Sequence, residues 1–137
     1  MIDKHSKIEQ FKKSNKNILE FGCGQSRKFS DSITIDIMDF DSVDVVVDIG
    51  KGLSFLPDNS IDEIHSYHFL EHIQDFEFLM KEIYRVLKIG GRKIGAVPHF
   101  SNPHFEDLKI HHVDYHHTNS LNGCIVVVDV VVALVVI

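Results

Sequence analysis

Two glycines follow an apolar run near the start of the chain, at a spacing that suits the binding of a small ligand. Residues 18–21 read Ile-Leu-Glu-Phe, and Gly22, Cys23 and Gly24 come directly after them. Glycine can adopt a positive φ and has no side chain to keep a ligand away from the backbone. We therefore expect a buried strand at 18–21 that enters a tight ligand-binding loop. The same Gly-x-Gly spacing also opens dinucleotide-binding domains and some ordinary turns, so the neighbouring residues must decide the ligand.

Carboxylates lie in or at the ends of the neighbouring apolar runs. Glu20 belongs to the first run, Asp36 lies in a predicted strand at 33–37, and Asp48 lies near the end of a β-branched strand predicted at 43–49. A carboxylate has two acceptor oxygens and can bind a pair of hydroxyl groups or an amino group. Because the carboxyl ends of parallel strands share one edge of a sheet, we expect these acids to lie beside the glycine loop.

The following stretch supplies further elements that would position these groups. We predict strands at 61–66 and 92–97 on either side of a helix at 75–88. Apolar residues recur on one face of that helix at Phe76, Leu79, Met80, Ile83 and Leu87. Asp75 is its predicted N-cap, and the glycines at 90–91 are predicted to stop it after Lys88. All the candidate ligand-binding groups then lie on one edge of a parallel sheet.

Three stretches carry a resemblance to a known family. Residues 20–26 read Glu-Phe-Gly-Cys-Gly-Gln-Ser, residues 56–73 begin Leu-Pro-Asp-Asn-Ser and end Phe-Leu-Glu-His-Ile, and residues 86–91 read Val-Leu-Lys-Ile-Gly-Gly. Together they resemble motifs of the class I S-adenosylmethionine-dependent methyltransferases. Ser26 stands in place of the family's third glycine, and Ile89 stands in place of a proline.

This resemblance, which covers roughly residues 16–105, implies the fold. It implies an α/β, three-layer sandwich around a Rossmann-like, doubly wound, mostly parallel sheet with the strand order 3-2-1-4-5. A chain of 137 residues is long enough for one domain but short for a complete sheet of this kind. We therefore expect a single S-adenosylmethionine-binding domain over residues 1–137 that is incomplete at its carboxyl end.

The resemblance also implies a set of cofactor-binding residues. They are Glu20, Gly22, Cys23, Gly24, Asp36, Ile37, Asp48, Ile49 and Ser66. The glycine loop would lie against the methionine part of S-adenosylmethionine, and Glu20 would meet its amino group directly or through water. Asp36 would bind both ribose hydroxyls. Asp48 would accept from the adenine amino group, with the Ile49 backbone N–H near the ring.

The first crossover favours this cofactor over a dinucleotide. Only residues 22–32 separate the first two predicted strands, which leaves room for one helical turn at most. A dinucleotide places its pyrophosphate on the N-terminus of a full helix, whereas S-adenosylmethionine has no phosphate. Asp36 stands 14 residues after Gly22, nearer than the ~20 residues typical of a nicotinamide site.

Histidines gather after the last of these strands, at His99, His104, His111, His112, His116 and His117. No Cys-x-x-Cys or His-Glu-x-x-His pattern accompanies them, so we predict no metal site. His99 would lie at the mouth of the strand at 92–97 and is the candidate catalytic residue, as an acid–base group or an orienter of the acceptor. The alternative is that His99 packs beneath the turns of Pro98 and Pro103.

Composition limits the partners and the compartment. The net charge of −6 argues against nucleic-acid binding, which depends on clustered Lys and Arg. Two cysteines, Cys23 and Cys124, give no disulfide framework and indicate a reducing compartment. No apolar export signal follows the basic N-terminal residues, so we expect a cytoplasmic protein.

The two ends of the chain carry further expectations. A short helix is predicted at 3–14, with Ile8 and Phe11 packed on the sheet. The apolar run at 124–137 is interrupted by Asp129 and is shorter than the ~18 residues of a membrane helix. We expect one or two buried strands there and no membrane association, with this run as a surface for homo-oligomerisation. A truncation or a shifted reading frame would also produce such a run.

The sequence therefore predicts an enzyme that transfers a methyl group from S-adenosylmethionine to an oxygen or nitrogen of a small-molecule or sugar acceptor. Two alternatives stay open. One is a cofactor-binding or interaction module of the same fold without catalysis. The other, less favoured, is a nicotinamide-dependent oxidoreductase.

Overall fold

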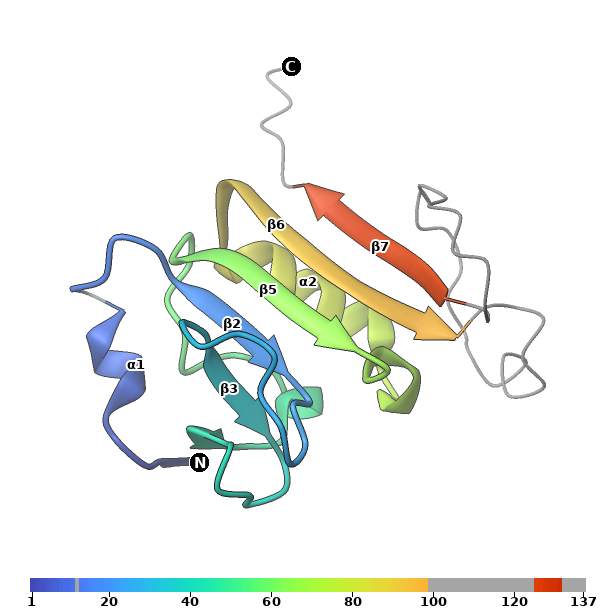
Figure 1. The fold of residues 1–137 in the computed structure, drawn as a ribbon. Coiled ribbons are helices and arrows are strands. Elements are labelled where there is room, and N and C mark those ends of the chain that lie inside the picture. Colours follow the sequence, from blue (N-terminus) through green and yellow to red (C-terminus); the bar gives the residue numbers. More distant parts are fainter. Residues whose placement is uncertain (12, 99–124, 132–137) are drawn as a thin grey trace.

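A seven-stranded sheet runs through the computed structural model, which describes residues 1–11, 13–98 and 125–131 (Figure 1). The strands are β1 (Ile2–Asp3), β2 (Ile18–Phe21), β3 (Ile33–Asp36), β4 (Val45–Val46), β5 (Ile61–Tyr67), β6 (Leu87–Pro98) and β7 (Ile125–Val131). Their order is β1-β4-β3-β2-β5-β6-β7. The five strands from β4 to β6 are parallel, which confirms the predicted order 3-2-1-4-5 and the Rossmann-like α/β class.

Helix α2 (Phe76–Val86) covers one face of the sheet. Leu79 and Ile83 are buried in the core and Phe76 and Met80 pack partly buried against it, as the apolar spacing predicts. Val86, which is not on the predicted face, is also buried. The carboxylate of Asp75 caps the helix by accepting from the Phe78 N–H at 3.0 Å. The predicted helix is too long at its carboxyl end, because Leu87 is extended, fully buried and paired with Ile61 in the sheet. The helix therefore ends before Leu87, because Leu87 is buried in β6, and not after Lys88 at the glycines of 90–91.

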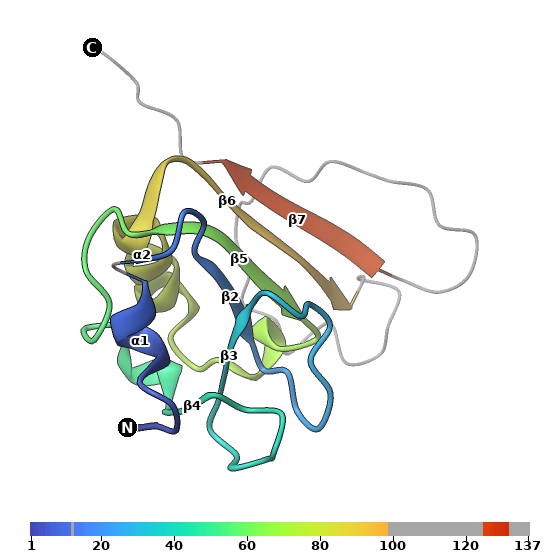
Figure 2. The same cartoon turned by 60° about the vertical axis from the view of Figure 1, so that its left-hand side comes forward.

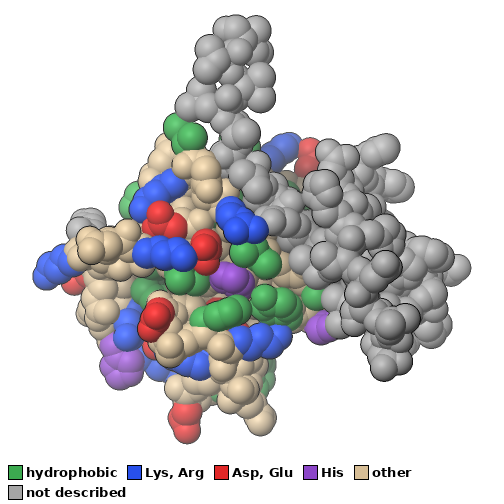
Figure 3. All heavy atoms as spheres, turned by 45° about the horizontal axis from the view of Figure 1, so that its top comes forward, with side chains coloured by type: hydrophobic (Ala, Val, Ile, Leu, Met, Phe, Trp, Pro, Cys, Tyr) green, Lys and Arg blue, Asp and Glu red, His purple; other side chains and the backbone are tan. Residues whose placement is uncertain are grey.

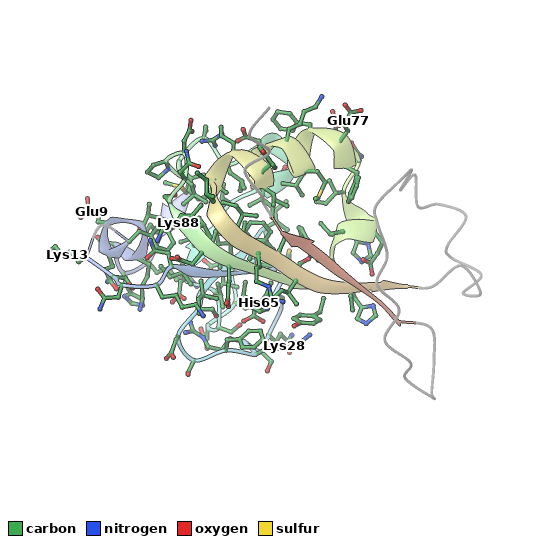
Figure 4. The ribbon with its side chains drawn as sticks, turned by 90° about the horizontal axis from the view of Figure 1, so that it is seen from above. Glu9, Lys13, Lys28, His65, Glu77 and Lys88 are labelled. Atoms are coloured by element: carbon green, nitrogen blue, oxygen red, sulfur yellow. The ribbon has the colours of Figure 1, made fainter. Side chains whose placement is uncertain are left out.

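The opposite face is covered by the loop that joins β2 to β3. Residues 22–32 are all described and contain no helix, where the sequence predicted one helical turn at most. The ring of Phe29 lies 4.3 Å from the ring of His65, and the ammonium of Lys28 lies 3.9 Å above the ring of Tyr67. Figure 4 shows Lys28 and His65 on the side of the sheet away from α2. A loop thus takes the place of a helical layer over this part of the sheet.

Polar side chains shorten two of the predicted elements. The helix predicted at 3–14 is reduced to α1 (Lys7–Gln10), because Ile2–Asp3 forms β1 against β4 and the Asp3 carboxylate accepts from the N–H groups of Lys7 and Ile8. The strand predicted at 43–49 is reduced to β4. The acids on either side of β4 bond elsewhere: Asp44 accepts from Oγ1 of Thr34, and Asp48 caps the 3₁₀ helix η1 (Ile49–Lys51). Figure 2 shows the amino end of the chain beside β4, at the edge of the sheet that β1 forms.

The predicted strand near the carboxyl end is confirmed for residues 125–131. β7 pairs antiparallel with β6, from Arg92 opposite Val131 to Pro98 opposite Ile125. It lies at the sheet edge opposite β1 (Figure 1). None of the helices in the described part of the chain is long and apolar enough to cross a membrane.

Candidate functional site

The carboxyl ends of β2, β3 and β5 meet at one edge of the sheet. Phe21 lies between Ile35 of β3 and Ser66 of β5 in the register. The Gly22 N–H then donates to the Ile35 carbonyl oxygen at 2.9 Å. The predicted ligand-binding loop therefore begins at the edge where a parallel sheet binds ligands. Basic and acidic side chains are interspersed on the face of the molecule seen in Figure 3, without a patch of a single charge.

The two glycines of this loop have different surroundings. Gly22 has φ of +65°, and a Cβ placed on it would lie 2.8 Å from Cγ of Phe69. Gly24 has φ of +57°, and a Cβ there would meet nothing within 4 Å. Gly22 is thus required for the close packing of Phe69, while Gly24 leaves open space beside the loop. Ser26, in place of a third glycine, is exposed.

The Glu20 carboxylate is hydrogen-bonded to the loop that joins β2 to β3. Its side chain is 2% exposed, and its two oxygens accept from the Lys28 N–H at 3.0 and 3.1 Å. One oxygen also accepts from the Phe29 N–H at 3.4 Å and from Oγ of Ser32 at 3.2 Å. A buried carboxylate is stabilised by such donors, and here they come from the crossover itself. Glu20 therefore shapes the helix-free crossover.

Asp36 ties the end of β3 to the glycine loop. Its Oδ2 accepts from the Gly24 N–H and its Oδ1 from the Met38 N–H, each at 3.0 Å. The next two side chains, Ile37 and Met38, are 61% and 56% exposed. A carboxylate and an apolar surface thus lie side by side at the edge of the sheet.

The other predicted site residues are used within the fold. Asp48 accepts from the Gly50 N–H at 3.1 Å and lies 3.5 Å from Nζ of Lys51. Ile49 is buried at 4% exposure. The Cys23 thiol lies near the Ser42 carbonyl oxygen at 3.9 Å, and burial raises the pKa of this thiol. Cys23 flanks the open loop, whereas the side chain of Ile49 belongs to the core.

Ser66 has a partner that the sequence pattern did not predict. Its side chain is 1% exposed, and its Oγ accepts from Nζ of Lys93 at 2.7 Å. Lys93 is 0% exposed, its ammonium also donates to the Ile94 carbonyl oxygen at 3.3 Å, and burial lowers its pKa to about 8. A lysine inside an apolar strand is the sequence signal for this pair, because charged side chains are seldom fully buried.

A second group of polar residues follows β5, in and just before the 3₁₀ helix η2 (Leu70–His72). Nδ1 of His68 lies 3.8 Å from Oε1 of Glu71. Oε2 of Glu71 is buried and has no hydrogen-bond partner in the described part of the chain. His68 has φ of +52°. His99 and the histidines from His104 to His117 lie outside the described residues.

Known proteins share this fold. An S-adenosylmethionine-dependent methyltransferase from Archaeoglobus fulgidus is 22% identical with a TM-score of 0.53, over 69% of this chain and 50% of that protein. Phosphoethanolamine N-methyltransferase 2 of Haemonchus contortus, solved with S-adenosyl-L-methionine, is 19% identical with a TM-score of 0.52, over 69% and 28%. The CMeT domain of the citrinin polyketide synthase is 13% identical with a TM-score of 0.60, over 86% and 46%.

The sequence itself matches a family model. Residues 39–94 match the family described as a methyltransferase domain. This match includes strands β4 and β5 and helix α2, and the glycine loop precedes it. The sequence has no significant match among curated proteins. This methyltransferase-like chain spans about half the length of several of the solved structures that it matches.

Proposed function

We propose that the chain binds S-adenosylmethionine at the carboxyl ends of β2, β3 and β4 and transfers its methyl group to an oxygen or nitrogen of a small-molecule or sugar acceptor. The observation that carries the proposal is the 3.0 Å bond from the Gly24 N–H to Asp36. This bond joins the glycine loop and the candidate ribose-binding acid into one unit. The helix-free crossover beside them supports a ligand without phosphate, because a pyrophosphate would need helical N–H groups.

The residues around Asp36 fit the proposed cofactor. A carboxylate can accept about four hydrogen bonds, and Asp36 uses two on the backbone, so two remain for ribose hydroxyls. The exposed side chains of Ile37 and Met38 can cover an adenine ring. Gly24 leaves the loop open for the methionine part. The cofactor supplies, when bound, a methyl group on a positively charged sulfur.

The remaining predicted residues take more indirect parts in this proposal. Glu20 would act through the backbone, because its carboxylate is hydrogen-bonded to the crossover and fixes the loop that a ligand would contact. Asp48 can accept from an adenine amino group with the oxygen lone pairs that the cap leaves free. Ser66 would stabilise the carboxyl ends of β2 and β5 next to the cofactor through its pairing with Phe21 and its bond to Lys93.

Methyl transfer depends mainly on alignment of the two reactants, and a base is needed only when the acceptor must lose a proton. His99 remains a proposed base or acceptor-orienting residue on the evidence of the sequence alone. A cytoplasmic, reducing location suits the free thiol of Cys23 beside the site. Association of two copies through residues 124–137 is likewise proposed from their apolar sequence.

Titration calorimetry with S-adenosylhomocysteine and, separately, with NAD tests the proposed ligand. We expect binding of the first in preference to the second. Asp36→Ala should weaken binding of S-adenosylhomocysteine by roughly 2–3 kcal/mol, or about 30- to 150-fold in Kd, because charge-assisted hydrogen bonds are lost. Asp41→Ala is the matched control, since Asp41 is an exposed acid in the loop that follows β3.

Two results would contradict the proposal. Equal affinity of the wild type and Asp36→Ala for S-adenosylhomocysteine would remove Asp36 from the site. Preferential binding of NAD would favour an oxidoreductase. Transfer of a labelled methyl group to a mixture of hydroxyl and amine acceptors separates an enzyme from a binding module, because a module binds the cofactor and labels nothing.

A further inference from the structure

The segment between β5 and α2 holds an imidazole and a carboxylate that the proposed cofactor site does not use. We propose that His68 accepts the proton of the methyl acceptor, and that Glu71 is the positioning residue that orients its imidazole. This inference rests on the proposed function, because it assigns the acceptor side of the same site.

The backbone places this pair beside the glycine loop. Phe69 stands between His68 and η2, and its ring packs so closely on Gly22 that no side chain would fit there. The His68 N–H donates to the Ala96 carbonyl oxygen at 2.9 Å, which fixes the residue against the carboxyl end of β6. His68 is therefore held between the loop after β2 and the end of β6, where an acceptor would approach a cofactor bound at the loop.

The side chains have the chemistry of a base and its orienting acid. The imidazole of His68 is 54% exposed, whereas the carboxylate of Glu71 is 13% exposed, with 3.8 Å between Nδ1 and Oε1. A carboxylate facing Nδ1 favours the proton on that nitrogen and leaves the Nε2 lone pair free to accept another proton. Such pairs are often long without ligand and shorten in the reacting complex.

His68 and Glu71 each have a feature that is unfavourable for the stability of the fold. His68 adopts a left-handed backbone conformation, with φ of +52°, which is unfavourable for a residue other than glycine. Oε2 of Glu71 is buried without a hydrogen-bond donor in the described residues, and such an atom costs free energy of folding. Unfavourable features of this kind persist where the surrounding structure requires them, and they cluster at functional sites.

The other described histidines are less suited to this role. His65 is buried, lies under Phe29 and faces Glu63 at 3.3 Å. His5 is exposed in the segment before α1. His72 is exposed at the end of η2 and forms no side-chain hydrogen bond or ion pair within the described part of the chain.

The proposed step is a balanced substitution. The oxygen or nitrogen of the acceptor forms a bond to the methyl carbon while the carbon–sulfur bond breaks, and that electron pair remains on sulfur. The proton of the acceptor passes to Nε2 of His68 and is then released to water. No oxidant, reductant or metal is needed for this balance.

The variants must respect the backbone at residue 68. His68→Asn removes the base, and asparagine is one of the residues that adopts the left-handed conformation readily. His68→Gly also fits and leaves room for added imidazole. Both should lower turnover by about 10²- to 10⁴-fold on an acceptor found in the labelling assay, with binding of S-adenosylhomocysteine retained. Imidazole in the buffer should restore part of the activity of His68→Gly. His5→Asn is the matched control.

A measurement without turnover tests the orienting role of Glu71. In ¹⁵N spectra of the free protein, Glu71→Ala should move the neutral His68 ring from the Nδ1–H form toward the Nε2–H form. Added S-adenosylhomocysteine should shift the His68 resonances and leave those of His5 unchanged. Because Glu71→Ala removes an unpartnered buried oxygen, we expect its melting temperature to be unchanged or higher. A purely structural carboxylate would give a lower melting temperature and no change of tautomer.

Each outcome supports or overturns the inference. Wild-type turnover in His68→Asn, or loss of turnover only in His72→Asn or His99→Ala, would assign the base elsewhere. An unchanged His68 tautomer in Glu71→Ala would remove the positioning role. Failure of the wild type to bind S-adenosylhomocysteine would contradict the proposed function itself, which separates the two failures.

Discussion

Lys93 is a buried cation whose removal should stabilise the protein at neutral pH. Its ammonium has three N–H donors but only two acceptors, Oγ of Ser66 and the Ile94 carbonyl oxygen, within the described residues. Its side chain is completely buried, and desolvation lowers its pKa to about 8. We predict that Lys93→Met raises the free energy of unfolding at pH 7, because methionine has a similar length and no charge to desolvate.

The pKa gives the size of this effect and its dependence on pH. A fall from 10.5 to about 8 corresponds to a cost on the order of 3 kcal/mol for folding with a charged Lys93, at about 1.4 kcal/mol per tenfold change in the acidity constant. Below pH 8 the ammonium is charged in both states, so the whole cost is present. Between pH 8 and pH 10.5 the unfolded chain binds more protons, and the stability of the wild type rises with pH.

Urea unfolding followed by circular dichroism measures this prediction. Lys93→Met should be more stable than the wild type by about 2–3 kcal/mol at pH 7, with a smaller difference at pH 10. Lys81→Met is the control, since Lys81 is an exposed helix residue that pairs with Glu77. A loss of stability in Lys93→Met at pH 7 would refute the reasoning. An identical gain at both pH values would show that added apolar packing, and not the buried charge, is responsible.

Two further changes test an ion pair on α2 and a close contact in the glycine loop. Arg85 donates to Glu82 and holds the pKa of that carboxyl at about 2, so Arg85→Met should lower the free energy of unfolding by about 2–4 kcal/mol. The wild type should lose this contribution to stability as the pH falls from 4.5 to about 2. Coincident acid-unfolding curves of the two proteins would contradict this. Gly22→Ala should lower the melting temperature more than Gly24→Ala, because only the first places a Cβ against Phe69, and equal melting temperatures would contradict that contact.

The sequence predicted the elements that depend on local patterns. β-Branched and apolar runs gave the parallel strands and, through the resemblance, their order. The helical spacing of Leu79 and Ile83 gave the buried face of α2, and the cap at Asp75 is confirmed. The short distance between β2 and β3 also predicted a crossover with room for one helical turn at most, and the structure has none there. These features depend on residues close in sequence, so they can be inferred without knowledge of the tertiary contacts.

Features that depend on distant residues could not be predicted in this way. The boundary between α2 and β6 is set by the pairing of Leu87 with Ile61, which overrides the glycines further along. The partners of Glu20 lie eight to twelve residues later in an irregular loop, so only the structure identifies that acid as the support of the crossover. The bond between Lys93 and Ser66 joins two strands and has no short-range signature.

The crossover at 22–32 also bears on how the protein folds. Eleven residues close the parallel ladder between β2 and β3, whereas the 26 residues at 99–124 separate β6 from β7. Each doubling of the length of a connection adds about 0.6 kcal/mol of closure entropy, and non-local contacts form more slowly than local ones. The strands that carry Gly22 and Asp36 can therefore pair before the outer edge of the sheet is complete. The candidate binding loop would then belong to the early-forming part of the domain, with β7 added later.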